Sequence, residues 1–190
     1  MSEPRPLVVK IGGGLLRDEG MEGLRRACAE VNEIAAGRPV LVVPGGGPFA
    51  DAVRAVDAQV GLGDAVAHRL ALHAMDQLGV LLAPLLSDCG VTLLAVVQTF
   101  AGRPDVPESW DVTSDSLAVL AAADNGAAEA VLLKAVEPPA CTMTAGELRA
   151  RQEAGEGRIV DRYMPEAVRR TGVTVVVRAV GGAGTRIVPG

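Results

Sequence analysis

LVVKIGGG, at residues 7–14, joins a short apolar run to a lysine and three successive glycines. VLVVPGGGP, at residues 40–48, repeats this pattern of an apolar run that ends in a glycine turn. Short continuous apolar runs bounded by turn residues are typical of strands that are buried on both faces. The two stretches therefore predict two buried strands, each ending in a glycine turn.

Each glycine turn precedes a segment with helical periodicity. Glycine has no Cβ, so its backbone N–H can approach an anion closely, and a helix that follows directs its positive end to the same place. Lys10 adds a positive charge at the end of the first strand. The turns have neither the dinucleotide fingerprint nor the Walker ending, so a plain tight turn is the alternative for each alone. Together they predict a phosphate-binding floor.

Strand-like and helical patterns alternate along the chain. We expect strands at residues 7–11, 40–43, 91–98, 130–134, 173–178 and 185–188, and helices at 21–36, 49–58, 64–82, 113–123, 145–154 and 164–170. Apolar strands separated by helices indicate a parallel sheet covered on both faces, with ligands beyond the carboxyl ends of its strands. The predicted fold is α/β, a three-layer αβα sandwich with a mainly parallel central sheet, built as one domain over residues 1–190.

Composition excludes several partners. The formal charge of −5 and the four aromatic residues (one Trp, one Tyr, two Phe) lack the basic excess and the stacking platforms of nucleic-acid binding. The most apolar stretch, residues 78–86, is too short to span a membrane. The first six residues lack the apolar run of a signal peptide, so we expect a cytoplasmic protein.

The order of the motifs resembles the amino acid kinase family, which includes acetylglutamate, aspartate, carbamate and bacterial uridylate kinases. The resemblance rests on the two glycine turns, on Thr113-Ser114-Asp115 at the start of an alanine-rich helix, on Leu132-Leu133-Lys134 at a strand end, and on Gly184-Thr185 with Ile187. It implies the fold predicted above, with ATP and Mg²⁺ as cofactors. It extends in order over nearly the whole chain.

The resemblance also implies residue roles. Lys10 would neutralise charge on the transferred phosphoryl group, and Asp115 would organise the active-site lysines near the metal. Gly12, Gly13 and Gly14 would bind the ATP phosphates, and the acceptor side would comprise Gly45, Gly46, Gly47, Asp111, Thr113 and Ser114. A carboxylate in the first turn of a helix, with Ser114 as its cap, is the alternative interpretation of Asp115.

Two strings, residues 67–79 and 110–116, resemble a narrower branch that contains the kinase of aminomethylfuran-methyl phosphate in methanofuran biosynthesis. Members convert a phosphate monoester to a diphosphate, so the acceptor is a phosphorylated small molecule that needs cations. Arg17 and Arg69 are candidates, and His68 is either in the acceptor pocket or a packing residue. Because residues 65–82 are apolar around much of the helix, we expect a homo-oligomer.

The chain departs from the family pattern after Lys134, which we expect at the nucleotide together with Glu137. Glu137 stands where many members have the aspartate of an Asp-Gly pair, and the glycine is missing. A second active-site lysine on a later glycine-rich segment has no clear counterpart, and Arg162 is the nearest candidate. The region after Glu137 is short for the family, which shortens the expected nucleotide-binding part.

Three functions remain open from the sequence. The first is an ATP-dependent phosphotransferase that makes a diphosphate ester of a furan-type one-carbon carrier, with Lys10, Asp115 and Arg162 acting on the transferred group. The second is a noncatalytic ligand-binding or scaffold protein that kept the anion floor and lost the adenine site. The third is an amino acid kinase that forms an acyl phosphate.

Overall fold

The computed structural model describes residues 5–156 and 159–190. Residues 1–4 lie outside the described part. They belong to the first six residues, on which the expectation of no signal peptide rests. Within that part a seven-stranded sheet has the order β3-β2-β1-β4-β6-β7-β5. Its strands are β1 (Leu7–Ile11), β2 (Val40–Pro44), β3 (Val91–Leu93), β4 (Glu129–Lys134), β5 (Cys141–Thr144), β6 (Thr174–Ala179) and β7 (Thr185–Val188). All strand pairs are parallel except β6 with β7.

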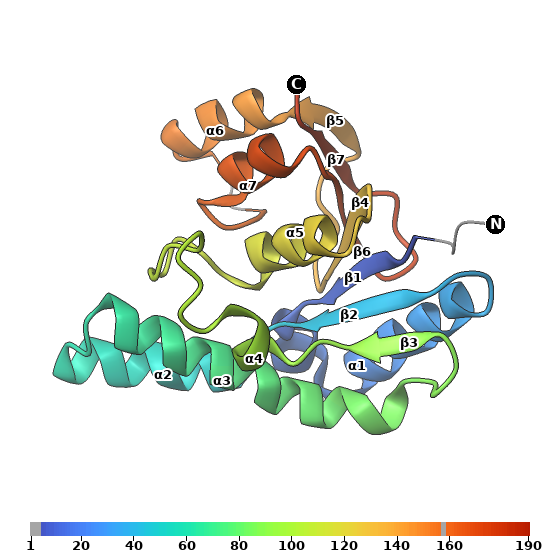
Figure 1. Ribbon diagram of the computed structural model, residues 1–190, viewed down its shortest axis with the longest axis horizontal. Helices are drawn as coiled ribbons and strands as arrows, with labels where there is room; N and C mark the ends of the chain where they lie inside the picture. Colours follow the sequence, from blue (N-terminus) through green and yellow to red (C-terminus); the bar gives the residue numbers. More distant parts are fainter. Residues whose placement is uncertain (1–4, 157–158) are drawn as a thin grey trace.

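Helices cover both faces of this sheet (Figure 1). They are α1 (Gly13–Ala35), α2 (Gly47–Val60), α3 (Asp64–Leu82), α4 (Val96–Phe100), α5 (Ser114–Asp124), α6 (Ala145–Glu153) and α7 (Met164–Thr171), with a 3-10 turn at Ala83–Leu85. One hydrophobic core packs under α1, and the other packs under α5 and α7. The predicted three-layer α/β architecture with a mainly parallel sheet is confirmed.

Strand alternation decides which side chains meet α5. Val8 of β1 and Leu132 of β4 belong to the core under α5, whereas Val9 and Leu133 belong to the core under α1. Successive side chains of a strand point to opposite faces. Lys10 has the parity of Val8, and Lys134 has the parity of Leu132, so both lysines lie on the α5 face at the carboxyl ends of adjacent strands.

The prediction of a strand over residues 91–98 is only partly correct. The strand β3 ends at Leu93, and residues 96–100 form the short helix α4. The carboxylate of Asp76, on α3, accepts the backbone N–H groups of Val96 and Val97 at 2.7 and 3.1 Å. These N–H groups lie in the first turn of α4, which a carboxylate from another helix thus caps. The β-branched pattern of the segment could not reveal that partner.

Two other elements differ from the expected ones. The first helix begins at Gly13 rather than at residue 21, and it bends at Gly20, whose φ of 63° and ψ of −152° are not helical. Gly20 is open to this conformation because it lacks a Cβ. The strand β5 was not predicted at all. It pairs with β7, so its place depends on a partner more than forty residues away.

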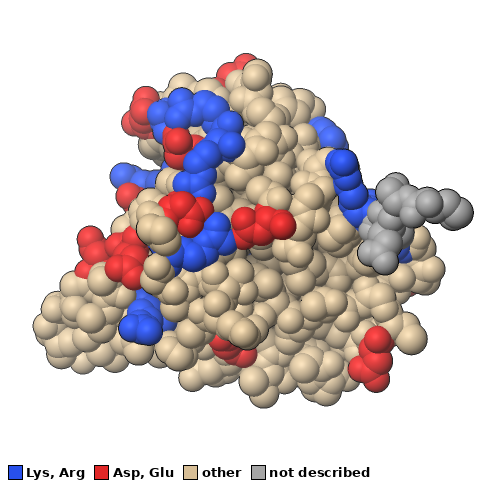
Figure 2. All heavy atoms as spheres, viewed as in Figure 1, with Lys and Arg blue, Asp and Glu red and all other residues tan. Residues whose placement is uncertain are grey.

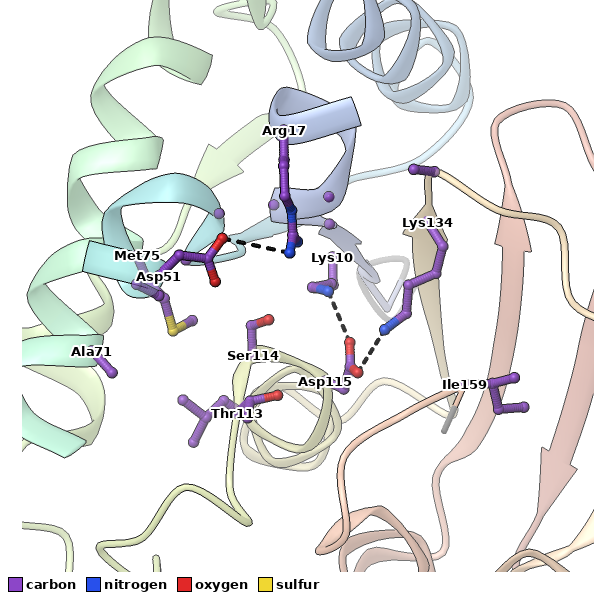
Figure 3. Close-up of a pocket in the computed structure, with 18 of the residues that line it drawn as sticks. Lys10, Arg17, Asp51, Ala71, Met75, Thr113, Ser114, Asp115, Lys134 and Ile159 are labelled. Atoms are coloured by element: carbon purple, nitrogen blue, oxygen red, sulfur yellow. Dashed lines mark hydrogen bonds and ion pairs between the residues drawn. The ribbon is translucent and has the colours of Figure 1, made fainter. Parts of the chain in front are cut away.

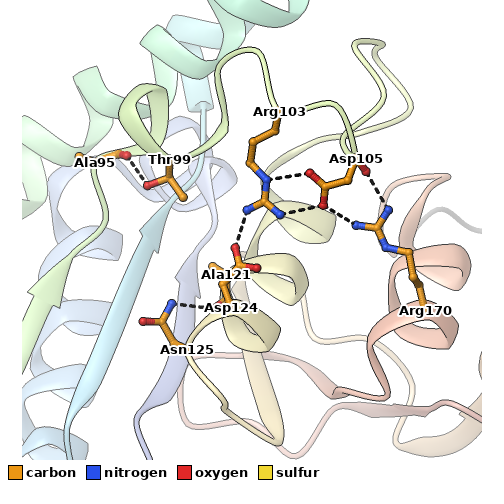
Figure 4. Close-up of polar contacts among 8 residues, drawn as sticks. All are labelled: Ala95, Thr99, Arg103, Asp105, Ala121, Asp124, Asn125 and Arg170. Carbon is orange, nitrogen blue, oxygen red and sulfur yellow. Dashed lines mark hydrogen bonds and ion pairs between the residues drawn. The ribbon is translucent and has the colours of Figure 1, made fainter.

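The loop between α4 and α5 is fastened by ion pairs (Figure 4). Arg103 bonds both Asp105, at 2.8 Å, and Asp124 of α5. Arg170 of α7 donates to the backbone carbonyl of Asp105 at 2.7 Å and to its carboxylate at 3.0 Å. The hydrogen bond from Arg103 lowers the pKa of Asp105 to about 2. The loop that carries residues 101–113 is therefore held against α5 and α7.

The surface is unevenly charged. Figure 2 shows acidic and basic side chains interspersed over α6 and α7, whereas the part of this face over the lower helices is mostly uncharged. Large apolar side chains are exposed on α2 and α3, among them Val60, Val66 and Val80, the last at 72%. In the described part of the chain, every helix is too short or too polar to cross a bilayer.

Candidate active site

Two lysines share one buried carboxylate at the carboxyl ends of β1 and β4. Lys10 Nζ lies 2.8 Å from Oδ1 of Asp115, and Lys134 Nζ lies 2.6 Å from Oδ2. Lys10 and Asp115 are 4% and 5% exposed. The carboxylate comes from the first turn of α5, and the N-cap of that helix is Thr113 rather than Ser114. Asp115 therefore binds both lysines as well as lying at a helix N-terminus.

The pKa values of Asp115 and Lys10 favour the ionised pair. Burial by itself raises the pKa of Asp115, but the ammonium groups of Lys10 and Lys134 overcome this and hold it well below its usual range. Burial lowers the pKa of Lys10 to about 8, against the opposing attraction of Asp115. A positive charge on Lys10 is therefore present at neutral pH and is lost as the pH rises through about 8.

This gives a prediction that needs no ligand. The sequence contains just two lysines, Lys10 and Lys134, so ¹³C-lysine labelling gives two resolved sets of NMR signals. We expect the Lys10 signal to titrate with a midpoint near pH 8, well below the ordinary lysine pKa of roughly 10.4. In Asp115→Asn the midpoint should move still lower, because the carboxylate favours the charged lysine. A midpoint above pH 10 in the wild-type protein would contradict the buried, desolvated environment.

The two glycine turns pack backbone against backbone. A Cβ on Gly13 would lie 2.0 Å from the backbone N of Gly47, and a Cβ on Gly45 would lie 2.5 Å from the N of Gly13. Gly47 also has a φ of +53°. The turn between β1 and α1 therefore contacts the turn between β2 and α2 through backbone atoms. A residue larger than glycine would have no room there. This contact brings the N-termini of α1 and α2 to one place.

The glycines of the two turns do not have equal access to a ligand. The N–H groups of Gly12 and Gly45 donate to the carbonyls of Leu133 and Ile11, at 2.8 and 2.9 Å. Gly13 and Gly14 lie in the first turn of α1, and Gly46 and Gly47 lie at the start of α2; all four line the cavity described next. The first N–H groups of a helix have no partner within it. These four glycines therefore form the available part of the floor.

A cavity of about 620 Å³ opens over this floor. Figure 3 shows Lys10 and Asp115 at its centre, with Ala71 and Met75 of α3 on one side and Lys134 and Ile159 on the other. The α3 side is lined by His68, Ala71, Leu72, Met75, Trp110 and Val112, and we name it the acceptor compartment after the role that we propose for it. The opposite side is lined by Ala135, Val136, Glu137, Pro138, Pro139, Ile159 and Val177, and we name it the nucleotide compartment for the same reason. Two ligands can thus approach the lysines from opposite directions.

The acceptor compartment has a charged rim. Arg17 of α1 lies 3.5 Å from the carboxylate of Asp51, which also pairs with Arg54 at 2.9 Å. The guanidinium of Arg54 stacks on Trp110, 4.7 Å from the ring centroid. The indole N–H of Trp110 donates to Asp57 at 2.8 Å. These contacts fasten the loop before α5 to α2 and leave Arg17 at the cavity.

Several residues expected at the acceptor do line the cavity, namely His68, Thr113 and Ser114. His68 is 4% exposed, and its Nδ1 lies 3.4 Å from the carbonyl oxygen of Ser109. Among the residues that the structure describes, its Nε2 has no hydrogen-bond partner. Arg69 and Asp111 are exposed and lie outside the lining of this cavity. The structure therefore separates these two from the other candidates.

Glu137 and Arg162 make contacts other than those expected. The carboxylate of Glu137 accepts the backbone N–H groups of Ala179 and Gly184, both at 2.6 Å, so it holds the hairpin between β6 and β7 while lying beside the nucleotide compartment. The hydrogen bond from Ala179 lowers the pKa of Glu137. Arg162 is exposed, 4.0 Å from Asp111 and outside the cavity lining. The second cation at Asp115 is Lys134, and this corrects the expectation that Arg162 fills that place.

The composition of the chain contains a second indication that Lys134 is a site residue, besides the family motif. The chain has eighteen basic residues, of which only two are lysines, and both bind Asp115. A compact ammonium fits between closely spaced oxygens, where the planar arginine fork does not. Because all other basic residues of the chain are arginines, the two lysines mark places that need a compact charge.

Asp161 is a partly buried residue beside the site that the sequence pattern did not predict. Its carboxylate lies against the first turn of α5 and accepts hydrogen bonds from Thr113 and Ser116. It precedes α7 by three positions, in a segment without a recognisable pattern. Its partner is more than forty residues away in the chain, so local sequence offers no signal for the contact.

The arrangement suits phosphoryl transfer. Such transfer needs two anionic groups held in line, with positive charge and N–H donors directed at the migrating group. Lys10, Lys134 and the four glycines supply these at one point between two compartments. In the described residues no cluster of three or more His, Cys, Asp or Glu side chains could hold a metal by itself. A Mg²⁺ ion would then be held largely by substrate phosphates, as is common for this ion.

Comparison with known proteins agrees with this geometry. Residues 5–138 match the model of the amino acid kinase family. A curated relative, the [5-(aminomethyl)furan-3-yl]methyl phosphate kinase of Methanocaldococcus jannaschii, is 26% identical over 129 residues, 59% of this chain and 57% of that protein. The match thus spans little more than half the length of the relative.

Solved structures show the same fold at lower identity. The uridylate kinase of Archaeoglobus fulgidus is 17% identical, with 96% of this chain and 99% of that chain covered and a TM-score of 0.73. Aspartate kinase from Synechocystis is 15% identical over 97% of this chain and 40% of its own, with a TM-score of 0.72. Carbamate kinase from Giardia lamblia, bound to AMP-PNP, is 15% identical with both chains fully covered and a TM-score of 0.61.

Proposed function

Because this chain belongs to the amino acid kinase family, we propose that it is an ATP-dependent phosphotransferase acting on a small phosphorylated acceptor. The observation that carries the proposal is the Lys10–Asp115–Lys134 triad, placed between two compartments of one cavity. We further propose a phosphate monoester of the aminomethylfuran-methyl phosphate type as acceptor, in the biosynthesis of a methanofuran-like one-carbon cofactor. The name of the curated relative supports this choice.

In the proposed reaction an oxygen of the acceptor phosphate bonds to the γ-phosphorus of ATP while the bond to the bridging oxygen breaks, so that ADP leaves and a diphosphate ester remains. Bound Mg²⁺ would neutralise charge among the phosphates. Gly13 and Gly14 bind the donor phosphates through backbone N–H groups, while Gly46 and Gly47 face the acceptor phosphate from the second turn. Lys10 and Lys134 stabilise the charge that spreads over the oxygens in the transition state. Asp115 favours the charged form of Lys10 and holds the ammonium groups of Lys10 and Lys134 at a fixed spacing.

The walls of the cavity support this division of roles. The acceptor compartment combines apolar side chains of α3 with the indole of Trp110, which suits a flat ring rather than an amino acid carboxylate. Arg17 lies at its rim as a cation for the phosphate of the acceptor. The nucleotide compartment is lined by two prolines and four aliphatic side chains, which are suited to the face of a base.

The proposal is tested in two steps. Calorimetric titration with AMP-PNP and Mg²⁺ should show binding by the wild-type protein and loss of binding in Lys10→Ala. With ATP and aminomethylfuran-methyl phosphate, ³¹P NMR should then show a diphosphate product. A protein that binds the acceptor but not AMP-PNP at millimolar concentration is instead the noncatalytic alternative, and a product trapped by hydroxylamine identifies an acyl phosphate.

We also propose that the protein is cytoplasmic and forms a homo-oligomer through α2 and α3. The exposed apolar side chains of these helices, Val56, Val60, Val66, Leu70 and Val80, support the oligomer, since apolar surface grouped on neighbouring helices favours association. Light scattering coupled to size-exclusion chromatography measures the subunit number directly.

A further inference from the structure

Asp161 makes four hydrogen bonds to the residues on either side of Asp115. Its Oδ2 accepts the backbone N–H and the hydroxyl of Thr113, both at 2.9 Å, and the backbone N–H of Ser116 at 3.0 Å. Its Oδ1 accepts the hydroxyl of Ser116. No other carboxylate in the described residues contacts the first turn of α5 in this way. Asp161 thus holds, through these hydrogen bonds, the helical turn that carries Asp115.

These bonds replace an ordinary helix cap. The N-cap residue of α5, Thr113, makes no capping bond with its own side chain, because the N–H of Ser116, which such a cap would accept, donates to Asp161 instead. The first N–H groups of a helix need partners from outside it, and a carboxylate there is also favoured by the helix dipole. The position of the first turn is therefore set by Asp161, from a segment 45 residues away from Ser116.

The segment that carries Asp161 is itself held in place. Gln152 of α6 donates to the backbone carbonyl of Asp161 at 2.9 Å, and the N–H of Met164 donates to the same oxygen at 3.3 Å. Tyr163 N–H donates to the carbonyl of Asp111 at 3.1 Å. Ile159, two residues before Asp161, lines the nucleotide compartment. The segment therefore links the wall of the nucleotide compartment to the turn that holds Asp115.

The charge of the Asp161 carboxylate makes its position costly in free energy. Burial, and next to it the nearby charge of Asp115, raise the pKa of Asp161 to about 6 against the opposing hydrogen bonds of Ser116 and Thr113. Lys10 is the cation whose field reaches Asp161, and it pairs with Asp115 rather than with Asp161. A partly buried carboxylate without an ion pair of its own costs free energy to keep, and its four hydrogen bonds offset that cost.

We propose that Asp161 is a positioning residue for phosphoryl transfer, which fixes the first turn of α5 so that Asp115 holds Lys10 and Lys134 at the spacing the transferred group requires. This inference rests on the proposed kinase function. It assigns to the segment before α7 a part in catalysis without contact with either substrate. The nucleotide compartment and the lysines are coupled through it.

Two substitutions separate position from charge. In Asp161→Asn the amide oxygen can accept the bonds made to Oδ2, and the hydroxyl of Ser116 can turn to accept from the amide nitrogen. In Asp161→Ala all four bonds are lost. We expect Asp161→Ala to lower kcat at least tenfold at pH 7 with KM for ATP within about threefold, and Asp161→Asn to keep kcat within about threefold.

The split between kcat and KM and the rescue by asparagine are readouts that a general loss of stability would not give. Below about pH 6 Asp161 takes up a proton, and a neutral carboxyl offers one acceptor and one donor, as the amide of Asp161→Asn does. The ratio of wild-type to Asp161→Asn kcat should therefore stay within about threefold on both sides of pH 6. Asp76→Ala is the matched control for Asp161→Ala, because Asp76 caps the first turn of α4 in the same manner, and it should keep kcat within about threefold. Wild-type kcat in Asp161→Ala, or a loss of kcat in Asp161→Asn as large as that in Asp161→Ala, overturns the inference.

A ligand-free measurement keeps the inference separate from the proposed function. In ¹³C-lysine spectra we expect Asp161→Ala to shift and broaden the signals of both Lys10 and Lys134, since Asp115 is no longer fixed. In Asp161→Asn the midpoint of Lys10 should fall, because a negative charge that favours the ammonium is gone. Unchanged lysine signals in Asp161→Ala overturn the inference whatever the activity. Shifted signals in a protein whose wild type transfers no phosphoryl group overturn the kinase function alone.

Discussion

Replacement of Lys10 by alanine is expected to lower kcat by about a hundredfold or more, the effect of removing one electrostatic contact to a transition state. Lys10 is the more deeply buried of the two cations at Asp115, with 5% of its side chain exposed against 23% for Lys134. A charge in such a desolvated place acts on the phosphoryl group with little screening by water. Steady-state kinetics with ATP and the acceptor measure the loss.

The matched control is Arg69→Ala, which removes a positive charge from α3 outside the cavity lining. It should change kcat by less than about threefold. Thermal unfolding of Lys10→Ala must also be cooperative, so that inactivity does not reflect a lost fold. Since Asp115 retains Lys134 in this variant, its carboxylate is not left unpaired. Normal turnover by a folded Lys10→Ala protein would show that Lys10 has no part in the chemistry.

Replacement of Gly13 by alanine is expected to destabilise the protein by roughly 2–5 kcal/mol, in the upper range for single substitutions. The new Cβ would lie 2.0 Å from the N and 2.3 Å from the Cα of Gly47. Both atoms belong to backbone, so no side chain can turn aside, and the two glycine turns must separate. Urea denaturation followed by circular dichroism measures the change. Separation should also weaken AMP-PNP binding at least tenfold, since it displaces the helix N-termini.

Gly14→Ala is the control for stability, one residue further along the same helix. Its Cβ would meet atoms no closer than 3.6 Å, and alanine is the better helix former by up to about 1 kcal/mol. We expect it to be as stable as the wild-type protein or slightly more stable. Equal stability of Gly13→Ala and Gly14→Ala would mean that the contact between the turns is not as close as the structure has it.

The sequence determined the layers of the fold because its signals are local. Apolar runs at 7–11 and 40–43 and the helix at 64–82 are set by side-chain periodicity, which any window of a few residues displays. The glycine turns were equally clear, because three successive glycines directly indicate a backbone segment without side chains. Once β1 and β4 are known to be neighbours, strand parity also places Lys134 with Lys10 on the face of α5.

Only the tertiary structure decided which distant groups meet. Arg162 has the charge expected beside Asp115, yet its segment turns it outward and presents Asp161 to α5 instead. Asp76 converts the end of a predicted strand into α4, and it does so from another helix. These outcomes depend on how loops and helices dock, which buries particular carboxylates against particular N–H groups. A hydrogen bond of this kind has no periodicity along the chain, so the sequence specifies it only through the completed fold.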